Sequence, residues 1–333
     1  MSCTNCLKPY ARFLKDGSIV AGSLSLLRDK PTTGIWKEIQ AVEYFNKSSQ
    51  NYLNLVQSIY PDAKLSEYIA IKLELFLLSL GAPSSNIVLN SITCSDDVNA
   101  TEFASIVNIG QSPPALNTFL GPFMGGGLAG YPHTGLLGLQ AFQSHATADN
   151  PNNGPLLIVN MPHIGITQQD DLVTSNNNVG RILRRGKSSA TSDNTCGAVV
   201  TAANWVMTNG IGGAAPTRGA GVFANNDQYY TLASILYTNR ATLCSTPYNF
   251  VLDATKYSDG VKLATEYIRV ASYTYLHDTL LPTNFALQNN LYLFSGTFIN
   301  VDDGWSSCIN VNSLQVLNGG AWTDLTTQFI STL

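Results

Sequence analysis

The chain has 333 residues, a formal net charge of −4 and only 12% charged side chains. Soluble domains usually carry about 25% charged residues, so uncharged polar residues and glycine must cover much of this surface. Such a surface suits a protein that buries area against a copy of itself, and we expect a homodimer. The small negative charge offers no basic footprint for nucleic acid or anionic lipid, and we expect neither as a partner.

No segment predicts a membrane span. The most apolar stretch, YIAIKLELFLLSLGA, is interrupted by Lys72 and Glu74 and falls short of the ~20 residues that a spanning helix needs. The N-terminus lacks a clear signal peptide, and six cysteines in a chain this long do not indicate a disulfide framework. We therefore expect a soluble protein in a reducing compartment, the cytoplasm or the interior of an organelle.

Residues 1–80 predict an N-terminal helical arm. Thr32 or Thr33 can cap a helix through IWKEIQAVEYF. The following segment LSEYIAIKLELFLLSL repeats apolar residues at helical spacing until Gly81, a residue type that often ends helices.

Residues 81–333 predict one α/β domain. Its middle alternates apolar strands with helices, which is typical of a mostly parallel sheet covered by helices on both faces. The tail, LYLFSGTFINV and SSCINVNSLQVLNGGAWTDL, instead indicates strands joined by polar turns. The strands expected in the middle are residues 86–93 and 155–161, and the helices are one beginning at Cys196 and two over residues 226–240 and 256–281.

Three potential metal ligands stand at the ends of these elements. Cys94 follows the first strand, His163 follows the second, and Cys196 begins a helix. Ligands bind at the carboxyl ends of strands in such sheets, and two cysteines with one histidine form a recognised catalytic zinc set with one open position. The free N–H groups at a helix start also favour the thiolate of Cys196. Cysteine is equally a common small core residue, and a single histidine is often a structural hydrogen-bonding group.

Several motifs, in order, resemble the limiting-carbon-dioxide-inducible (LCIB-type) proteins. This family is also described as θ-class carbonic anhydrases, related in fold and site to the β class. The resemblance spans roughly residues 80–330, whereas residues 1–80 share only a general helical character. The motifs are CSDD, GGGLAGYPHTGLLGLQAFQSH, PHIGI, GRILRRGK and TCGA.

The resemblance implies a Zn²⁺ cofactor and carbonic anhydrase activity. Zinc would be bound by Cys94, His163 and Cys196, beside an Asp–Arg dyad in which Asp96 is the acidic residue and Arg184 the arginine. A zinc-bound hydroxide, oriented by this dyad, would attack carbon dioxide and give bicarbonate. The implied small-molecule partners are thus carbon dioxide, bicarbonate and water.

The chain departs from the β-class pattern at the dyad. That pattern has arginine two residues after the aspartate, where Val98 stands here. The LCIB-type pattern takes the arginine from the segment before the last cysteine, where Arg184 matches best and Arg181 and Arg185 are rivals.

Other polar residues leave their roles open. His133 and His145 fall in the family-like glycine-rich segment and could be pocket walls, a proton shuttle or structural hydrogen-bonding residues. Cys3 and Cys6 form a C-x-x-C without a second pair, so they do not make a zinc finger.

Two other functions remain compatible with these residues. One is a non-catalytic structural or regulatory partner in inorganic-carbon handling that keeps the same zinc-site fold. The other is a zinc hydrolase acting on a different small electrophile. Measured turnover of carbon dioxide would distinguish a carbonic anhydrase from both of these alternatives.

Overall fold

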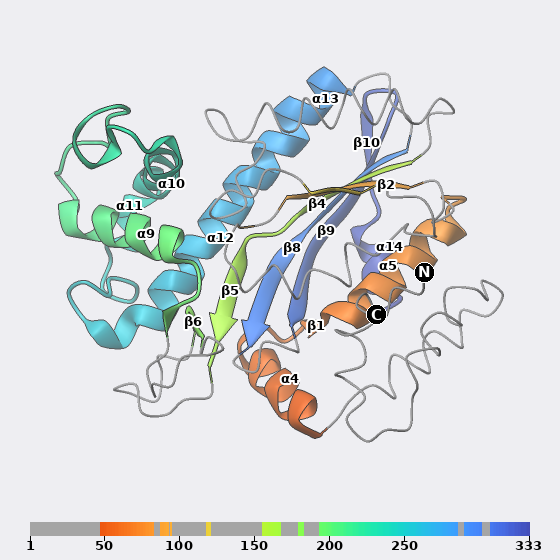
Figure 1. Cartoon of the computed structure of the whole chain (residues 1–333), viewed down its shortest axis with the longest axis horizontal. Helices are drawn as coiled ribbons and strands as arrows, with labels where there is room; N and C mark the ends of the chain where they lie inside the picture. The colour runs from red at the N-terminus through yellow and green to blue at the C-terminus, as the bar shows by residue number, and fades with distance from the viewer. Residues whose placement is uncertain are drawn as a thin grey trace, which may run out of the picture.

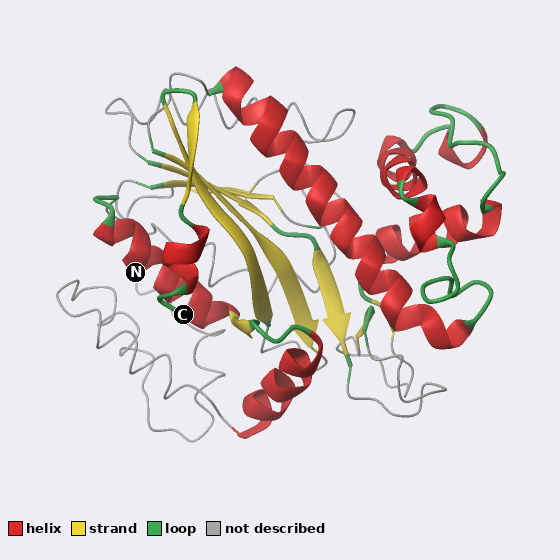
Figure 2. Cartoon of the chain, turned by 180° about the vertical axis from the view of Figure 1, so that it is seen from behind, coloured by secondary structure: helices red, strands yellow, loops and turns green. Residues whose placement is uncertain are grey.

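The fold is described from a computed structural model of the chain (Figures 1 and 2). The described residues are 47–82, 87–92, 94, 118–120, 155–167, 179–182, 193–285, 290–301 and 307–333.

A mixed sheet of eight strands forms the centre of the molecule. Its order is β1-β9-β8-β4-β2-β3, with β5 also pairing β8 and β10 pairing β9. The strands are β1 (Lys64–Leu65), β2 (Val88–Ile92), β3 (Thr118–Leu120), β4 (Leu156–Asn160), β5 (His163–Ile166), β8 (Leu291–Val301), β9 (Cys308–Asn318) and β10 (Ala321–Asp324). A separate antiparallel pair joins β6 (Arg181–Ile182) and β7 (Asp193–Asn194).

The prediction of a mostly parallel sheet is confirmed only in part, because strands of the tail make the sheet mixed. Strands β2, β3, β4, β5 and β8 pair in parallel, but β9 runs antiparallel to β8, β1 and β10. The β9–β10 connection is a tight turn at Gly319 and Gly320, whose φ angles of 55° and 83° match the hairpin turns in which glycine is favoured. The expected tail of strands joined by turns is thus confirmed, and it makes the sheet mixed.

Helices cover both faces of the sheet, as predicted. On one face, α5 (Ser66–Ser79) and α14 (Thr326–Ile330) pack against the strands. Leu73 and Leu77 of α5 and Phe329 of α14 are fully buried in this core. Helix α5 ends before Gly81, whose φ of 84° is the left-handed conformation common after helices.

The other face is covered by α12 (Tyr257–Tyr275), which continues through a π-helical turn, η5 (Leu276–Leu280), into α13 (Leu281–Asn284). This long helix crosses the sheet diagonally in Figure 1. On its outer side lies a helical group that shares a core with it. The group consists of α9 (Gly197–Asn209), the short 3₁₀ turn η3 (Gly221–Phe223), α10 (Asp227–Thr238) and α11 (Arg240–Leu243).

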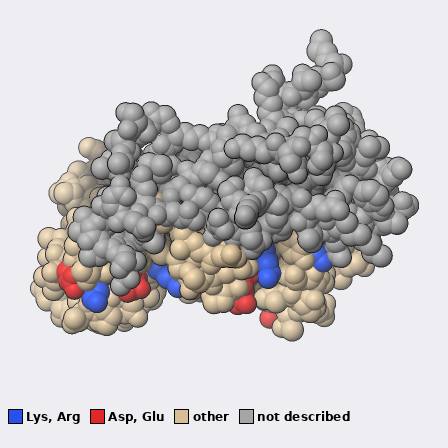
Figure 3. All heavy atoms as spheres, turned by 90° about the horizontal axis from the view of Figure 1, so that it is seen from below, with Lys and Arg blue, Asp and Glu red and all other residues tan. Residues whose placement is uncertain are grey.

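The remaining described helices are α4 (Lys47–Ile59), before β1, and the short 3₁₀ turn η4 (Ala254–Lys256), before α12. None of the described helices is long and apolar enough to cross a membrane. Where described residues are visible in Figure 3, a few basic and acidic side chains lie near one another among uncharged residues. The helix expected through IWKEIQAVEYF lies outside the described residues.

Candidate metal centre

The structure brings Cys94, His163 and Cys196 together. The potential ligand atoms of the three side chains all lie within 4.8 Å of one another, and the two Sγ atoms are 3.7 Å apart. All three residues are buried, with 4%, 0% and 5% of their surfaces exposed. Cys94 precedes His163 by 69 positions and Cys196 by 102 positions, so the fold, not closeness in sequence, brings the three side chains together.

The ends of two parallel strands deliver the first two residues. Cys94 lies two residues after the end of β2, and His163, the first residue of β5, lies three residues after the end of β4. Strands β2 and β4 are parallel neighbours, and Met161 N donates to Ile92 O at 3.1 Å where they end. The residues that follow the two strands therefore lie side by side, as the sequence predicts for Cys94 and His163.

Cys196 occupies the N-cap position of α9. The preceding residue is fixed by a bond from Thr195 N to Gly180 O of 2.9 Å. This segment packs tightly on β5, because a Cβ on Gly165 would stand 1.9 Å from Thr195 Oγ1. Glycine at this position thus lets the loop carrying Cys196 approach the strand that carries His163.

The donor set and its spacing fit a tetrahedral zinc ion. Two Zn–S bonds of about 2.3 Å at a tetrahedral angle place the sulfur atoms about 3.8 Å apart, and the sulfur atoms here are 3.7 Å apart. Two thiolates and one imidazole are ligands that Zn²⁺ prefers, and three protein ligands leave a fourth position for water or substrate. A metal of this charge would also neutralise two buried thiolates, which are costly to leave uncompensated.

Asn300, on β8, fixes the orientation of the histidine ring. His163 Nδ1 lies 2.8 Å from Asn300 Oδ1, and Asn300 is fully buried. An amide oxygen can only accept, so Nδ1 carries the proton and the lone pair of the buried Nε2 is the one available to a metal. Sequence reasoning missed Asn300, although a polar residue in the otherwise apolar run TFINV was a usable signal.

One of the three arginines considered for the dyad is described. Arg181, on β6, lies with its guanidinium 4.3 Å from the centre of the Tyr257 ring. Burial raises the pKa of Tyr257 to about 12; the positive charge of Arg181 opposes this rise and the negative charge of Cys196 adds to it. Tyr257 also contacts Asn194, two residues before Cys196, through its hydroxyl. The arginine-bearing segment therefore starts near Cys196, a potential ligand.

The other predicted site residues lie outside the described residues. They are Asp96 and Arg184, the rival Arg185, and the two histidines of the glycine-rich segment, His133 and His145. Val98 and the C-x-x-C of Cys3 and Cys6 lie outside as well.

Comparisons with known proteins agree with the motifs. The family of limiting CO2-inducible proteins B/C, described as beta carbonic anhydrases, matches residues 64–256. The crystal structure of PtLCIB4, a homolog of the limiting CO2-inducible protein LCIB, is similar with a TM-score of 0.56 and 20% identity, covering 82% of this chain and 98% of that one. The structure of LCIB itself has a TM-score of 0.52 and 13% identity, covering 84% and 98%.

No curated protein matches the sequence. The family match nevertheless spans more than half of the chain and includes all three residues of the cluster. This chain belongs to the family of limiting CO2-inducible proteins B/C, the beta carbonic anhydrases of that type.

Proposed function

We propose that the protein binds Zn²⁺ through Cys94, His163 and Cys196 and catalyses the reversible hydration of carbon dioxide to bicarbonate. The observation that carries this proposal is the buried cluster of these three side chains, at a spacing that suits tetrahedral zinc, in a chain of this family. When bound, zinc supplies a Lewis acid that lowers the pKa of a coordinated water from 15.7 to about 7.

The protein's own groups would tune this chemistry. Two thiolates cancel the formal charge of the ion, so this site acidifies water less strongly than three neutral histidines would. The helix N-terminus at Cys196 counters this effect, because its free N–H groups draw negative charge from the sulfur. Asn300 holds His163 in the tautomer that presents Nε2.

Asp96 and Arg184 complete the proposed site. Asp96, two residues after Cys94, would accept a hydrogen bond from the reacting hydroxide and so direct the hydroxide's lone pair at carbon dioxide. Arg184 would keep Asp96 ionised and away from the metal. Support for an arginine from this segment comes from Arg181, which stacks on Tyr257, a residue whose pKa the charge of Cys196 helps to raise.

Stopped-flow measurement of carbon dioxide hydration tests the proposal. Protein with one zinc per chain is expected to accelerate hydration, and Asp96→Ala is expected to lose most of this acceleration while retaining its zinc. Zinc-loaded, folded protein without turnover would refute the enzymatic proposal.

The second candidate is a non-catalytic zinc protein that acts through a partner in inorganic-carbon handling. This candidate requires that no arginine pairs with Asp96. Val98 stands in the position of the β-class arginine, and an aspartate without a paired arginine can coordinate the metal itself. Full zinc occupancy with no turnover, and recovery of turnover in Val98→Arg, is the result expected of this candidate.

We also propose that the chain forms a homodimer, which would cover part of its weakly charged surface. Analytical ultracentrifugation at micromolar concentration is expected to show twice the 35.8 kDa chain mass. A concentration-independent monomer would contradict this.

A further inference from the structure

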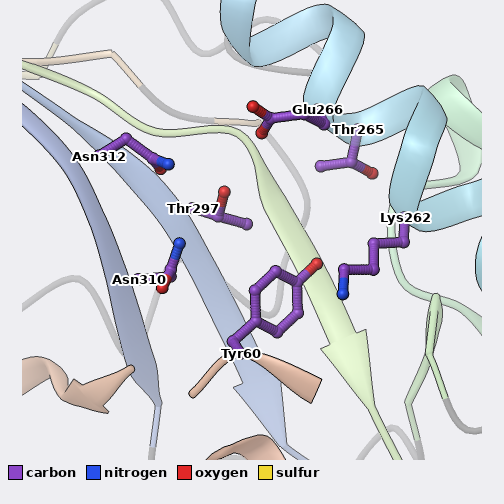
Figure 4. Close-up of a pocket in the computed structure, with 7 residues that line it drawn as sticks. All are labelled: Tyr60, Lys262, Thr265, Glu266, Thr297, Asn310 and Asn312. Carbon is purple, nitrogen blue, oxygen red and sulfur yellow. The ribbon is translucent and has the colours of Figure 1, made fainter. Parts of the chain in front are cut away.

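A polar cleft lies between α12 and the strands β8 and β9, on the face of the sheet opposite α5 (Figure 4). Its volume is about 210 Å³, which is room for a molecule smaller than a typical drug-sized ligand. It shares no residue with the cysteine–histidine cluster. The lining residues are Tyr60, Lys262, Thr265, Glu266, Thr297, Asn310 and Asn312.

The cleft exists because α12 is polar in the middle of its sheet-facing side. Val261 and Leu276 anchor the helix in two separate apolar clusters. Between them, Thr265, Arg269 and Ser272 are buried with 2%, 9% and 1% exposure. Burying polar groups between a helix and a sheet is unfavourable unless they gain hydrogen bonds. The hydrogen-bond partners of each polar side chain therefore indicate which kind of ligand the cleft could bind.

The helix side of the cleft is satisfied internally. Thr265 Oγ1 donates to a backbone carbonyl at 2.9 Å, and Ser272 Oγ donates to Asn160 Oδ1 at 3.0 Å. Arg269 donates from Nε and Nη2 to the two carboxylate oxygens of Glu266, at 2.8 and 2.6 Å. The negative charge of Glu266 is thus matched by its neighbour on the helix.

On the sheet side of the cleft, polar side chains lack hydrogen-bond partners among the described residues. Neither Thr297, with 3% exposure, nor Asn310 has a side-chain hydrogen bond to another described residue. Asn312 Oδ1 is buried without a partner among these residues, but as an acceptor it contributes nothing to binding an anion. Figure 4 shows the amide nitrogens of Asn310 and Asn312 directed toward the space beside Thr297. These nitrogens provide hydrogen-bond donors on the floor of the cleft.

Lys262 and Tyr60 add stronger donors at the mouth. Lys262 Nζ donates to Ile59 O at 3.0 Å and lies 4.6 Å from the centre of the Tyr60 ring. It forms no ion pair with any described residue, so its positive charge is unbalanced. Burial, and secondly the charge of Glu266, raises the pKa of Tyr60 well above its usual value. The phenol therefore stays protonated and can donate.

We propose that this cleft binds a small carboxylate monoanion, held by the ammonium of Lys262, the hydroxyl of Tyr60 and the amide nitrogens of Asn310 and Asn312. Hydrogen bonds to a charged group are about twice as strong as neutral ones, which favours an anion over a neutral polyol in a site rich in donors. Glu266 lines the cleft, and although Arg269 pairs with it, its nearby negative charge repels a dianion more than a monoanion.

Isothermal titration of zinc-loaded, full-length protein with acetate, at constant ionic strength, tests this inference. Acetate is expected to bind more tightly than sulfate or glycerol. Lys262→Met keeps the side-chain length but removes the charge, and is expected to weaken acetate binding about tenfold or more. Tyr60→Phe is expected to weaken it roughly fivefold. Lys256→Met, which removes the same charge outside the cleft, is the matched control and should bind as wild type.

Glu266→Gln supplies a test of opposite sign. Removing the only carboxylate among the lining residues is expected to tighten acetate binding and to narrow the difference from sulfate. The inference is overturned if acetate does not bind, if glycerol binds as tightly, or if Lys262→Met and Tyr60→Phe leave binding unchanged. The last result would locate the anion elsewhere, such as at the metal. Because the readout is binding, these outcomes do not depend on whether carbon dioxide is hydrated.

Discussion

Cys196→Ser is expected to abolish stoichiometric zinc binding, with a loss of affinity greater than about 100-fold. The serine hydroxyl does not ionise near neutral pH, so only one thiolate and one imidazole would remain to hold the ion, and second-shell changes alone cost 10- to 100-fold. Cys196 is buried and its Sγ lies 3.7 Å from that of Cys94, so water cannot readily replace it as a ligand.

Elemental analysis after dialysis against a chelator measures this effect. Cobalt substitution adds an independent signature, because thiolate-to-cobalt charge-transfer bands should fall in the variant. Cys244→Ser is the matched control, since Cys244 is half-buried and its Sγ faces Val206 O at 3.7 Å, away from the cluster. A Cys196→Ser protein that keeps one zinc per chain would remove this residue from the ligand set.

Asn300→Leu is expected to weaken zinc binding by about 10- to 100-fold without touching a ligand. Leucine has nearly the shape of asparagine but cannot accept the proton of His163 Nδ1, a bond of 2.8 Å in the native protein. The imidazole then loses both its fixed tautomer and part of its basicity. Competition with a chromophoric chelator measures the change.

Asn300→Asp separates this role from simple packing. A carboxylate also accepts from Nδ1, so zinc affinity is expected to return to at least the native level. If both variants bind zinc as the native protein does, Asn300 does not position the histidine. If both variants lose zinc affinity equally, Asn300 contributes to the stability of the fold and not to the position of His163.

The sequence predicted the meeting of the three potential ligands for a simple physical reason. Parallel neighbouring strands end at the same edge, and Cys94 and His163 follow two such strands. The helix at Cys196 was predicted from its composition and begins one residue later, at Gly197.

What the sequence did not predict depends on contacts between distant segments. Alternating apolar residues indicate a strand but not its neighbour, so the insertion of β8 between β4 and β9 and the mixed sheet were missed. Asn300 was missed for the same reason, because it acts on His163 from a separate strand of the tail. The roles of Asp96 and Arg184 remain proposals, since both lie outside the described residues.

The central position of β8 also constrains how the protein can be made. A ribosome releases β2, β4 and β5 well before residues 291–301, yet β8 is the strand that β4 and β5 pair with. Until then one edge of the apolar strand β4 (LLIVN) stays open, and unpaired apolar edges invite aggregation. The sheet can therefore form only after residues 291–301 have been synthesised. A chain truncated after residue 256 would contain all three potential zinc ligands but would lack the strand that pairs with β4 and β5.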